Sequence, residues 1–181
     1  MLDVYKIRKD FPILGKKVNN TDLIYFDNAA TSQTPNQVID VISSYYKENN
    51  SNIHRGLHSL SADATNKYEN SRSVIKNHFG AAYEHEIIFT SGTTHGINIV
   101  SSGLEKFISS KDELIVSEME HHSNIVPWQM LCEKTGSKLK VIPINDDGTL
   151  DMNEYKSLLT NQVKFVFINH VSNTLGTVSY T

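Results

Sequence analysis

The sequence predicts an α/β fold, with a mostly parallel sheet and flanking helices. From residue 86 onward, short apolar runs typical of buried strands alternate with segments whose apolar residues recur at helical spacing. Strand and helix alternate about every 25 residues, as parallel strands joined by crossover helices require. The apolar fraction of 39% is sufficient for a core, and a net charge of −3 without Lys or Arg runs does not indicate binding to nucleic acid or anionic membranes.

The first part of the chain combines a charged amphipathic segment with a small-residue loop. Apolar residues at helical spacing predict a short helix within the first dozen residues, ending at Pro12. An apolar run predicts a strand at 23–26, followed by a loop at 27–30. A helix is expected to start at Thr34, with Pro35 at its first helical position. Its expected buried stripe consists of Val38, Val41, Ile42 and Tyr45.

The remaining elements follow in a regular order. A longer helix is expected at 61–79, with Gly80 as its C-terminal stop. Strands are expected at 86–90, 113–117, 138–143 and 163–169. Helices are expected between them at 94–107, 124–135 and 152–159. We divide the chain into an N-terminal arm or helix at 1–20 and a large α/β domain at 21–181.

One strand–helix junction has the composition of a phosphate site. Ligands of open parallel sheets bind beyond the carboxyl ends of the strands. After the strand predicted at 86–90, Gly92 permits a tight turn, and Thr93 and Thr94 open the next helix. Free N–H groups and the helix dipole favour a phosphate there, although a threonine at a helix start is also an ordinary N-cap. The chain contains neither a dinucleotide-binding glycine motif nor a P-loop motif.

Two further junctions carry polar residues. His121 and His122 follow the strand predicted at 113–117, and an imidazole there could stack on a planar cofactor, transfer a proton or bind a metal. Adjacent side chains in an extended loop point in different directions, which disfavours one shared metal. The alternative is a polar loop that only caps a helix. Residues 169–176 are either a polar site or a simple turn.

The sequence predicts no metal site and no disulfide. His54 and His58 are spaced as a metal pair only in a helix, and Gly56 argues against a helix there. Cys132 is the only cysteine, and we interpret it as a buried structural residue rather than a nucleophile. Because the chain has no signal-like start and no apolar run of roughly 20 residues, we expect a cytoplasmic protein.

Five segments taken together resemble one enzyme family. They are YFDNAATSQTP, NIHRGLHSLS, FTSGTTHGIN, SEMEHHSNIVPWQ and HVSNTLGT. Their order and register are similar to those of the SUF-type (group II) cysteine desulfurases, which are class V aminotransferase-like pyridoxal-phosphate enzymes. The resemblance covers essentially the whole chain, and MEHHSNIVPWQ is its most diagnostic part. It implies the large domain, in part, of the PLP-dependent transferase fold type I.

The resemblance implies roles for individual residues. Thr93 and Thr94 match positions that bind the phosphate of pyridoxal 5'-phosphate. His121 matches a histidine that stacks on the pyridine ring and is proposed to transfer protons. Asn173 matches an asparagine beside the ring and the substrate carboxylate. The residues that match the lining or mouth of the substrate pocket are Ala29, Ala30, His54 and Arg55.

The function implied by the resemblance is removal of sulfur from L-cysteine, giving L-alanine and an enzyme persulfide for iron–sulfur cluster assembly. The resemblance also implies a homodimer and a sulfur-acceptor protein as partner. The family's cofactor lysine and persulfide-forming cysteine lie beyond the point matched by residue 181, so we expect an inactive N-terminal fragment. His95 and Asn28 depart from the residues common in the family, Glu and Ser.

Three alternatives remain at this point. The chain could belong to a selenocysteine lyase or to another class V lyase or aminotransferase. It could instead be a truncated, non-catalytic binding protein, or a zinc-binding module.

Overall fold

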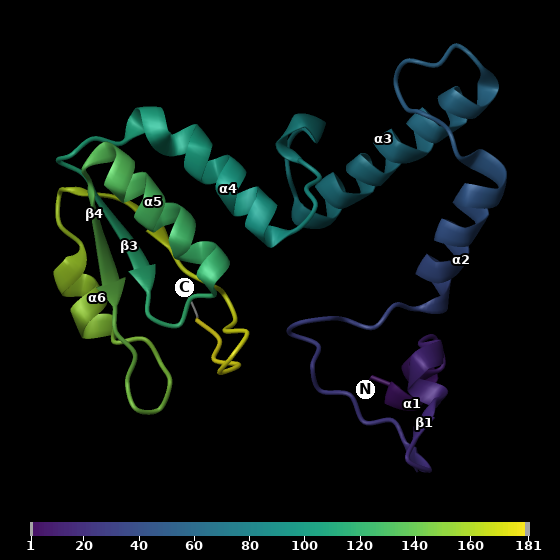
Figure 1. The fold of residues 1–181 in the computed structure, drawn as a ribbon, viewed down its shortest axis with the longest axis horizontal. Helices are drawn as coiled ribbons and strands as arrows, with labels where there is room; N and C mark the ends of the chain where they lie inside the picture. The colour runs from purple at the N-terminus through teal and green to yellow at the C-terminus, as the bar shows by residue number, and fades with distance from the viewer. Residues whose placement is uncertain (1, 180–181) are drawn as a thin grey trace. The chain divides into compact units, whose positions relative to one another are not determined.

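A computed structural model describes residues 2–179 (Figure 1). The chain forms two compact units, Met1–Ile88 and Phe89–Thr181, called here the N-terminal and C-terminal units. The division of the chain at residue 20 into an arm and a large domain stays a prediction.

The C-terminal unit contains a three-stranded parallel sheet in the order β4-β3-β5. The strands are β3 (Glu113–Ser117), β4 (Lys138–Ile142) and β5 (Val163–Phe167). Helix α5 (Val126–Thr135) connects β3 to β4, and α6 (Met152–Leu158) connects β4 to β5. The α/β class and the parallel sheet are therefore confirmed, and three of the expected strands are present, with β4 and β5 ending slightly earlier than predicted.

The core of this unit lies between the sheet and two helices. Strand β3 is central and buried at every position, because it has a neighbour on each side. Trp128 of α5 is 1% exposed and stacks on Phe167 of β5, with 3.6 Å between the ring centroids and 6° between their planes. Helix α4 (Thr93–Leu104) lies beside α5 and packs Ile97 and Leu104 against the same cluster (Figure 1).

The ends of these helices follow from local sequence. Helix α5 has Pro127 in its first turn and ends at Gly136, whose φ of 74° is left-handed and favours glycine. Asp151 caps α6 by accepting hydrogen bonds from two backbone N–H groups. The helix expected at 94–107 is α4 followed by the 3-10 turn η4 (Glu105–Phe107). The helix expected from residue 124 begins two residues later, after the 3-10 turn η5 (His122–Asn124).

The N-terminal unit is mostly helical. Its helices and turns are α1 (Val4–Arg8), η1 (Pro12–Gly15), α2 (Asn36–Ser44), the π-helical η2 (Tyr45–Asn49), α3 (Ser59–Phe79) and η3 (Glu84–Glu86). Two-residue strands, β1 (Lys17–Val18) and β2 (Thr21–Asp22), form an antiparallel pair that the sequence did not indicate. Gly80 ends α3 with a φ of 68°, as predicted. Pro35 is the N-cap of α2 rather than its first helical residue.

Three expectations for the apolar segments are wrong. Residues 23–26 and 87–90 are not strands, and Glu86 closes a 3-10 turn. Among the described residues, no neighbouring strand supplies the ladder of hydrogen bonds that these runs would need. The expected stripe of α2 is not buried: Val38, Val41 and Ile42 are exposed. Apolar periodicity predicted the helix correctly, but these three side chains remain exposed among the described residues.

Within residues 2–179, no helix is both long enough and apolar enough to cross a bilayer.

Candidate functional site

Helix α4 begins at Thr93, as predicted for the phosphate site, but the strand expected immediately before it is not formed at residues 87–90. Gly92 is its N-cap, with φ 149° and ψ 174°, and it provides no side-chain cap. A φ of this kind favours glycine because of the backbone conformation. Space is not the reason, since no atom lies within 4 Å of the position of an added Cβ. Thr93 and Thr94 are exposed in the first turn. An uncapped helix start with two hydroxyl groups is a suitable donor set for a phosphate.

The residues beside this turn hold its shape. The Thr90 hydroxyl donates to the carbonyl oxygen of Gly92 at 3.1 Å. The backbone N–H of Ser91 donates to Nδ1 of His95 at 3.3 Å, and the Ser91 hydroxyl lies 3.0 Å from the same nitrogen. His95, one of the two departures from the family pattern, therefore folds back against the first turn of α4.

His121 has a defined ring orientation. It is the N-cap of η5, and its Nδ1 accepts the backbone N–H of Ser123 at 3.1 Å. The Ser123 hydroxyl lies 2.8 Å from the same nitrogen. Because Nδ1 accepts a backbone hydrogen bond, the neutral ring carries its proton on Nε2. His122 is edge-to-face to His121, with 6.2 Å between the centroids.

Glu120, next to His121, is the centre of a hydrogen-bond network that the sequence did not reveal. It is 8% exposed and accepts from Ser117, Asn124 and Asn169. Asn124 in turn accepts from the indole N–H of Trp128. The available signal was that both β3 and β5 are followed by polar residues, which parallel pairing brings to one sheet edge.

Asn173 lies in a tight turn after β5. Ser172 is buried, and its hydroxyl oxygen accepts the backbone N–H groups of residues 174 and 175 at 3.3 and 3.1 Å. The Thr177 hydroxyl donates to the carbonyl oxygen of Gly148 at 2.9 Å. Asn173 is exposed, and its amide lies 3.4 Å from the hydroxyl of Thr174. The turn is therefore well defined, while the Asn173 side chain is accessible.

The segments that contain three of the predicted cofactor residues lie at one end of the C-terminal unit. Figure 1 shows the N-terminal ends of α4 and α5 and the carboxyl end of β3 at the same end of this unit. The turn η5 lies against α4, and Asn169 after β5 bonds to Glu120. This arrangement brings together the segments that contain Thr93, Thr94 and His121, while Asn173 follows four residues after Asn169.

The predicted pocket-mouth loop lies in the N-terminal unit and is tied to the start of α3. The buried Ser61 hydroxyl accepts the N–H of Gly56 at 3.1 Å and donates to the carbonyl oxygen of Asn52 at 2.8 Å. A Cβ on Gly56 would lie 2.3 Å from the Cβ of Ser61. His54 has a left-handed φ of 68°, and its N–H donates to the Thr65 hydroxyl at 2.9 Å. Such strain persists only where the surroundings fix it.

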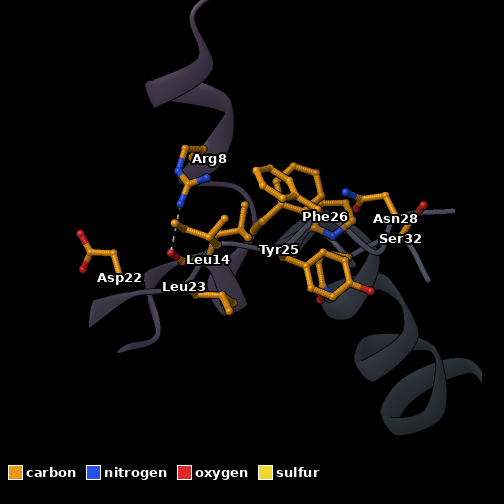
Figure 2. A pocket seen from close by; sticks show the side chains of 12 residues that line it. Arg8, Leu14, Asp22, Leu23, Tyr25, Phe26, Asn28 and Ser32 are labelled. Carbon is orange, nitrogen blue, oxygen red and sulfur yellow. Dashed lines mark hydrogen bonds between the residues drawn. The ribbon is translucent and has the colours of Figure 1, made fainter. Parts of the chain in front are cut away.

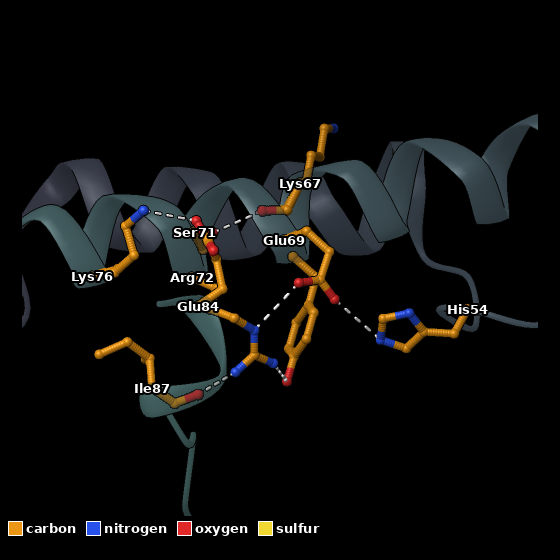
Figure 3. Close-up of polar contacts among 9 residues, drawn as sticks. His54, Lys67, Glu69, Ser71, Arg72, Lys76, Glu84 and Ile87 are labelled. Carbon is orange, nitrogen blue, oxygen red and sulfur yellow. Dashed lines mark hydrogen bonds and ion pairs between the residues drawn. The ribbon is translucent and has the colours of Figure 1, made fainter. Parts of the chain in front are cut away.

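A polar cluster on α3 holds the ring of His54 (Figure 3). Nε2 of His54 lies 3.5 Å from the Glu69 carboxylate, and the ring packs edge-to-face on Tyr68 at 5.6 Å. Arg72 pairs with the same carboxylate at 3.3 Å and donates to the carbonyl oxygen of Ile87. The loop that contains His54 and Arg55 is thus fixed within this unit.

Ala29 and Ala30 lie in a short exposed turn. The Tyr25 hydroxyl contacts the carbonyl oxygens of Asp27 and Thr31 at 3.1 and 2.7 Å and closes this turn. The adjacent cavity has a volume of about 710 Å³ and a largely apolar lining. Figure 2 shows the side chains that line it. Its lining includes Arg8, Phe11, Leu14, Tyr25, Phe26 and Asn28.

The two groups of predicted residues lie in different units. Whether Ala29, Ala30, His54 and Arg55 share a site with the residues of the C-terminal unit stays a prediction. Cys132 is buried in α5, and burial raises the pKa of its thiol, which agrees with the structural interpretation. Among residues 2–179, no three His, Cys, Asp or Glu side chains are placed to hold a metal ion.

Known proteins are similar to this chain over nearly its full length. A "Probable cysteine desulfurase" of Staphylococcus epidermidis is 51% identical over 175 residues, which cover 96% of this chain and 42% of that protein. The apo structure of a cysteine desulfurase of Thermococcus onnurineus superposes with a TM-score of 0.87 at 39% identity, over 98% of this chain and 42% of the other. A structure of SspA in complex with cysteine superposes with a TM-score of 0.74 at 26% sequence identity. The match covers 86% of this chain and 44% of SspA.

The family model for aminotransferase class-V matches residues 24–181. The solved relatives share the α/β architecture, so the fold expected from the resemblance is confirmed. The chain spans less than half the length of the relatives it matches. The sequence motifs, the parallel sheet and these matches agree, and the chain belongs to the aminotransferase class-V family.

Proposed function

We propose that this chain forms the N-terminal part of a pyridoxal-phosphate-dependent cysteine desulfurase. The proposed reaction releases sulfur from L-cysteine and leaves L-alanine and an enzyme persulfide. The uncapped start of α4, located at the same end of the unit as the oriented His121, is the main supporting observation. The desulfurase relatives and the cysteine-bound SspA support the substrate.

The residues of the C-terminal unit fit the proposed cofactor. Backbone N–H groups and hydroxyls at Thr93 and Thr94 would hold its phosphate, and the helix dipole would favour the negative charge. Once bound, pyridoxal phosphate supplies an electron sink for the carbanion formed from the amino acid. His121 would lie against the pyridine ring and hold a proton at Nε2, since Nδ1 is occupied by Ser123.

The remaining proposed contacts concern the substrate. The accessible amide of Asn173 would orient the substrate carboxylate from its turn. Ala29, Ala30, His54 and Arg55 would line the pocket or its mouth. We also propose a homodimer in the cytoplasm that passes persulfide sulfur to an acceptor protein of iron–sulfur cluster assembly.

The phosphate role is tested in the longest natural protein that contains this sequence. Replacing both hydroxyls in a Thr93→Val/Thr94→Val variant should weaken pyridoxal-phosphate binding about tenfold or more, because each charge-assisted hydrogen bond contributes on the order of 1.5–3 kcal/mol. Cofactor titration followed by absorbance measures this change. Unchanged affinity would contradict the assignment. Thr135→Val, which alters a hydroxyl on α5, is the matched control.

The histidine register is tested in the same protein. His121→Ala should slow alanine formation by about 10²-fold or more, the range for loss of a general acid or base, and should alter the cofactor spectrum. His122→Ala should do neither. The reverse result would show that the neighbouring histidine occupies the cofactor position.

The residues that the resemblance places beyond position 181 lead to a third test. Residues 1–181 expressed alone should form no alanine and no sulfide from cysteine above the background of free pyridoxal phosphate. The reason is that the matched lysine and sulfur-accepting cysteine are not in this sequence. Activity that Cys132→Ala abolishes would overturn both this expectation and the structural role of Cys132.

A further inference from the structure

We propose that Glu120 is a positioning residue that fixes the backbone beside His121, so that the histidine is oriented before any cofactor binds. The inference rests on the proposed function, because it assigns Glu120 a role through His121. It concerns side chains that have no matched role in the family resemblance.

The Glu120 carboxyl group joins the ends of two strands to the start of a helix. Its Oε1 accepts the Ser117 hydroxyl at 2.5 Å and the backbone N–H of Asn169 at 2.8 Å. Its Oε2 accepts the side-chain amide of Asn124 at 2.8 Å. These donors come from the end of β3, the residues after β5 and the turn η5. One buried side chain thereby holds three separate segments together.

Asn124 carries this constraint to His121. The backbone N–H of Asn124 donates to the carbonyl oxygen of His121 at 2.7 Å. The Asn124 side chain is held at both ends, since its amide donates to Glu120 and its Oδ1 accepts Nε1 of Trp128 at 2.9 Å. Trp128 is fixed in the core by stacking on Phe167. The position of the His121 backbone is therefore set from the core through Asn124 and Glu120.

The three donors around Glu120 require a side chain with two acceptor oxygens at this position. All three partners direct a hydrogen toward the carboxyl group, so both oxygens must accept. A glutamine here would present an amide N–H to one of these donors. A buried donor facing another donor is unfavourable, and the loop would move to relieve it. A shift of about 1 Å at a reacting group can cost about 10²-fold in rate.

Two substitutions combined in one protein move the carboxyl group from residue 120 to residue 124 without losing a hydrogen bond. In Glu120→Gln/Asn124→Asp, Oε1 of the glutamine still accepts from Ser117 and Asn169. Its amide now donates to one oxygen of the new aspartate, while the other aspartate oxygen accepts from Trp128. Each single variant breaks the donor–acceptor match, whereas the double variant restores it with the carboxyl group at position 124. Such a cycle separates geometry from the presence of an acid at residue 120.

The experiment uses the longest natural protein, with wild type, both single variants and the double variant. We expect Glu120→Gln to lower kcat for alanine formation about tenfold or more with KM within about twofold, the signature of lost positioning. It should also change the circular dichroism of bound pyridoxal phosphate. Hydrogen exchange of the backbone at 118–125 should become faster in the cofactor-free protein. The double variant should restore all three measurements.

Several results would overturn the inference. A wild-type kcat and unchanged exchange in Glu120→Gln would show that the network does not position His121. A double variant as impaired as the single one would assign the effect to the acid itself. An inactive wild type that binds no pyridoxal phosphate would overturn the proposed function as well, whereas an active wild type with an unaffected variant overturns only this inference.

A milder pair of variants covers the case in which Glu120→Gln does not fold. Ser117→Ala removes one donor to Glu120, and Ser101→Ala removes a buried hydroxyl that donates to the carbonyl oxygen of Pro127 at 3.1 Å. Ser117→Ala should lower kcat and speed exchange at 118–125, and Ser101→Ala should not. Equal effects of the two would overturn the positioning role.

Discussion

The two units contain similar kinds of apolar residues but bury them very differently. In the C-terminal unit, all of β3 is buried, and Trp128 closes one face of the sheet. Among residues 2–88, only Ser61 and Ala64 are buried. Apolar periodicity therefore predicts which face of an element is apolar, while burial depends on whether the same unit supplies a second layer.

The two units also differ in what holds them. The C-terminal unit depends on side-chain packing between α4, α5 and the sheet. The N-terminal unit is held more by polar contacts than by side-chain packing. Examples are the hydrogen bonds of Ser61 to the backbone of residues 52–56 and the ion pair of Arg72 with Glu69. Substitutions of equal size should therefore have unequal effects in the two units.

The largest expected difference is between two aromatic residues. Trp128→Ala should lower the free energy of unfolding of the C-terminal unit by about 3–5 kcal/mol, because it leaves a cavity beside Phe167 and removes the donor to Asn124. The Phe26 side chain is 92% exposed in the N-terminal unit. Phe26→Ala should therefore change the free energy of unfolding of that unit by no more than about 0.5 kcal/mol. Denaturant unfolding of both variants measures the contrast.

Equal losses for the two aromatic residues would break the comparison. They would show that Phe26 is covered by another part of the protein, so that the exposed apolar faces of the N-terminal unit are sites of packing.

The next largest effect on stability is expected at Gly56. It tests whether the polar contacts of Ser61 hold the N-terminal unit. Gly56→Ala should lower the free energy of unfolding by about 1–3 kcal/mol. The new Cβ would overlap Ser61 and displace the loop that contains His54. Gly103→Ala, in the last turn of α4, is the control, because no atom lies within 4 Å of its added Cβ and alanine has a higher helix propensity than glycine. Thermal unfolding checks both. A harmless Gly56→Ala would mean that the 52–58 loop is not held by Ser61.

The sequence predicted the C-terminal unit better because its signals are local. Apolar runs gave β3, β4 and β5, and the Gly-Thr-Thr turn gave the start of α4 at Thr93. The run at 23–26 looked the same but has no strand neighbour among the described residues, a fact that local sequence does not contain.

The candidate site was predictable only in part. His121 was found from the resemblance, and its ring orientation needed the position of Ser123. The link from Glu120 to Asn169 joins residues 49 positions apart, through the pairing of β3 with β5. Register between distant strands decides such contacts. Periodicity identifies strands without giving that register.

The smallest expected effect concerns an ion pair on the sheet, and it depends on pH. The Glu113 side chain is 6% exposed and lies 2.8 Å from Nζ of Lys140 on the neighbouring strand β4. The hydrogen bond from Lys140 lowers the pKa of Glu113 below its ordinary value of 4.5, with a further contribution from the Thr160 hydroxyl. A carboxyl group with a lowered pKa in the folded protein stabilises the fold above its unfolded pKa. This stabilisation is lost as the pH falls through the folded pKa.

Glu113→Gln should therefore lower the free energy of unfolding at pH 7, and its difference from wild type should shrink as the pH drops below about 4.5. Lys140→Met removes the main cause of the shift and should flatten the same pH dependence. Denaturant unfolding at pH 7 and at lower pH values measures both variants. A difference that stays constant, or grows, on acidification would show that Lys140 does not hold the Glu113 carboxylate, and that packing alone stabilises this edge of the sheet.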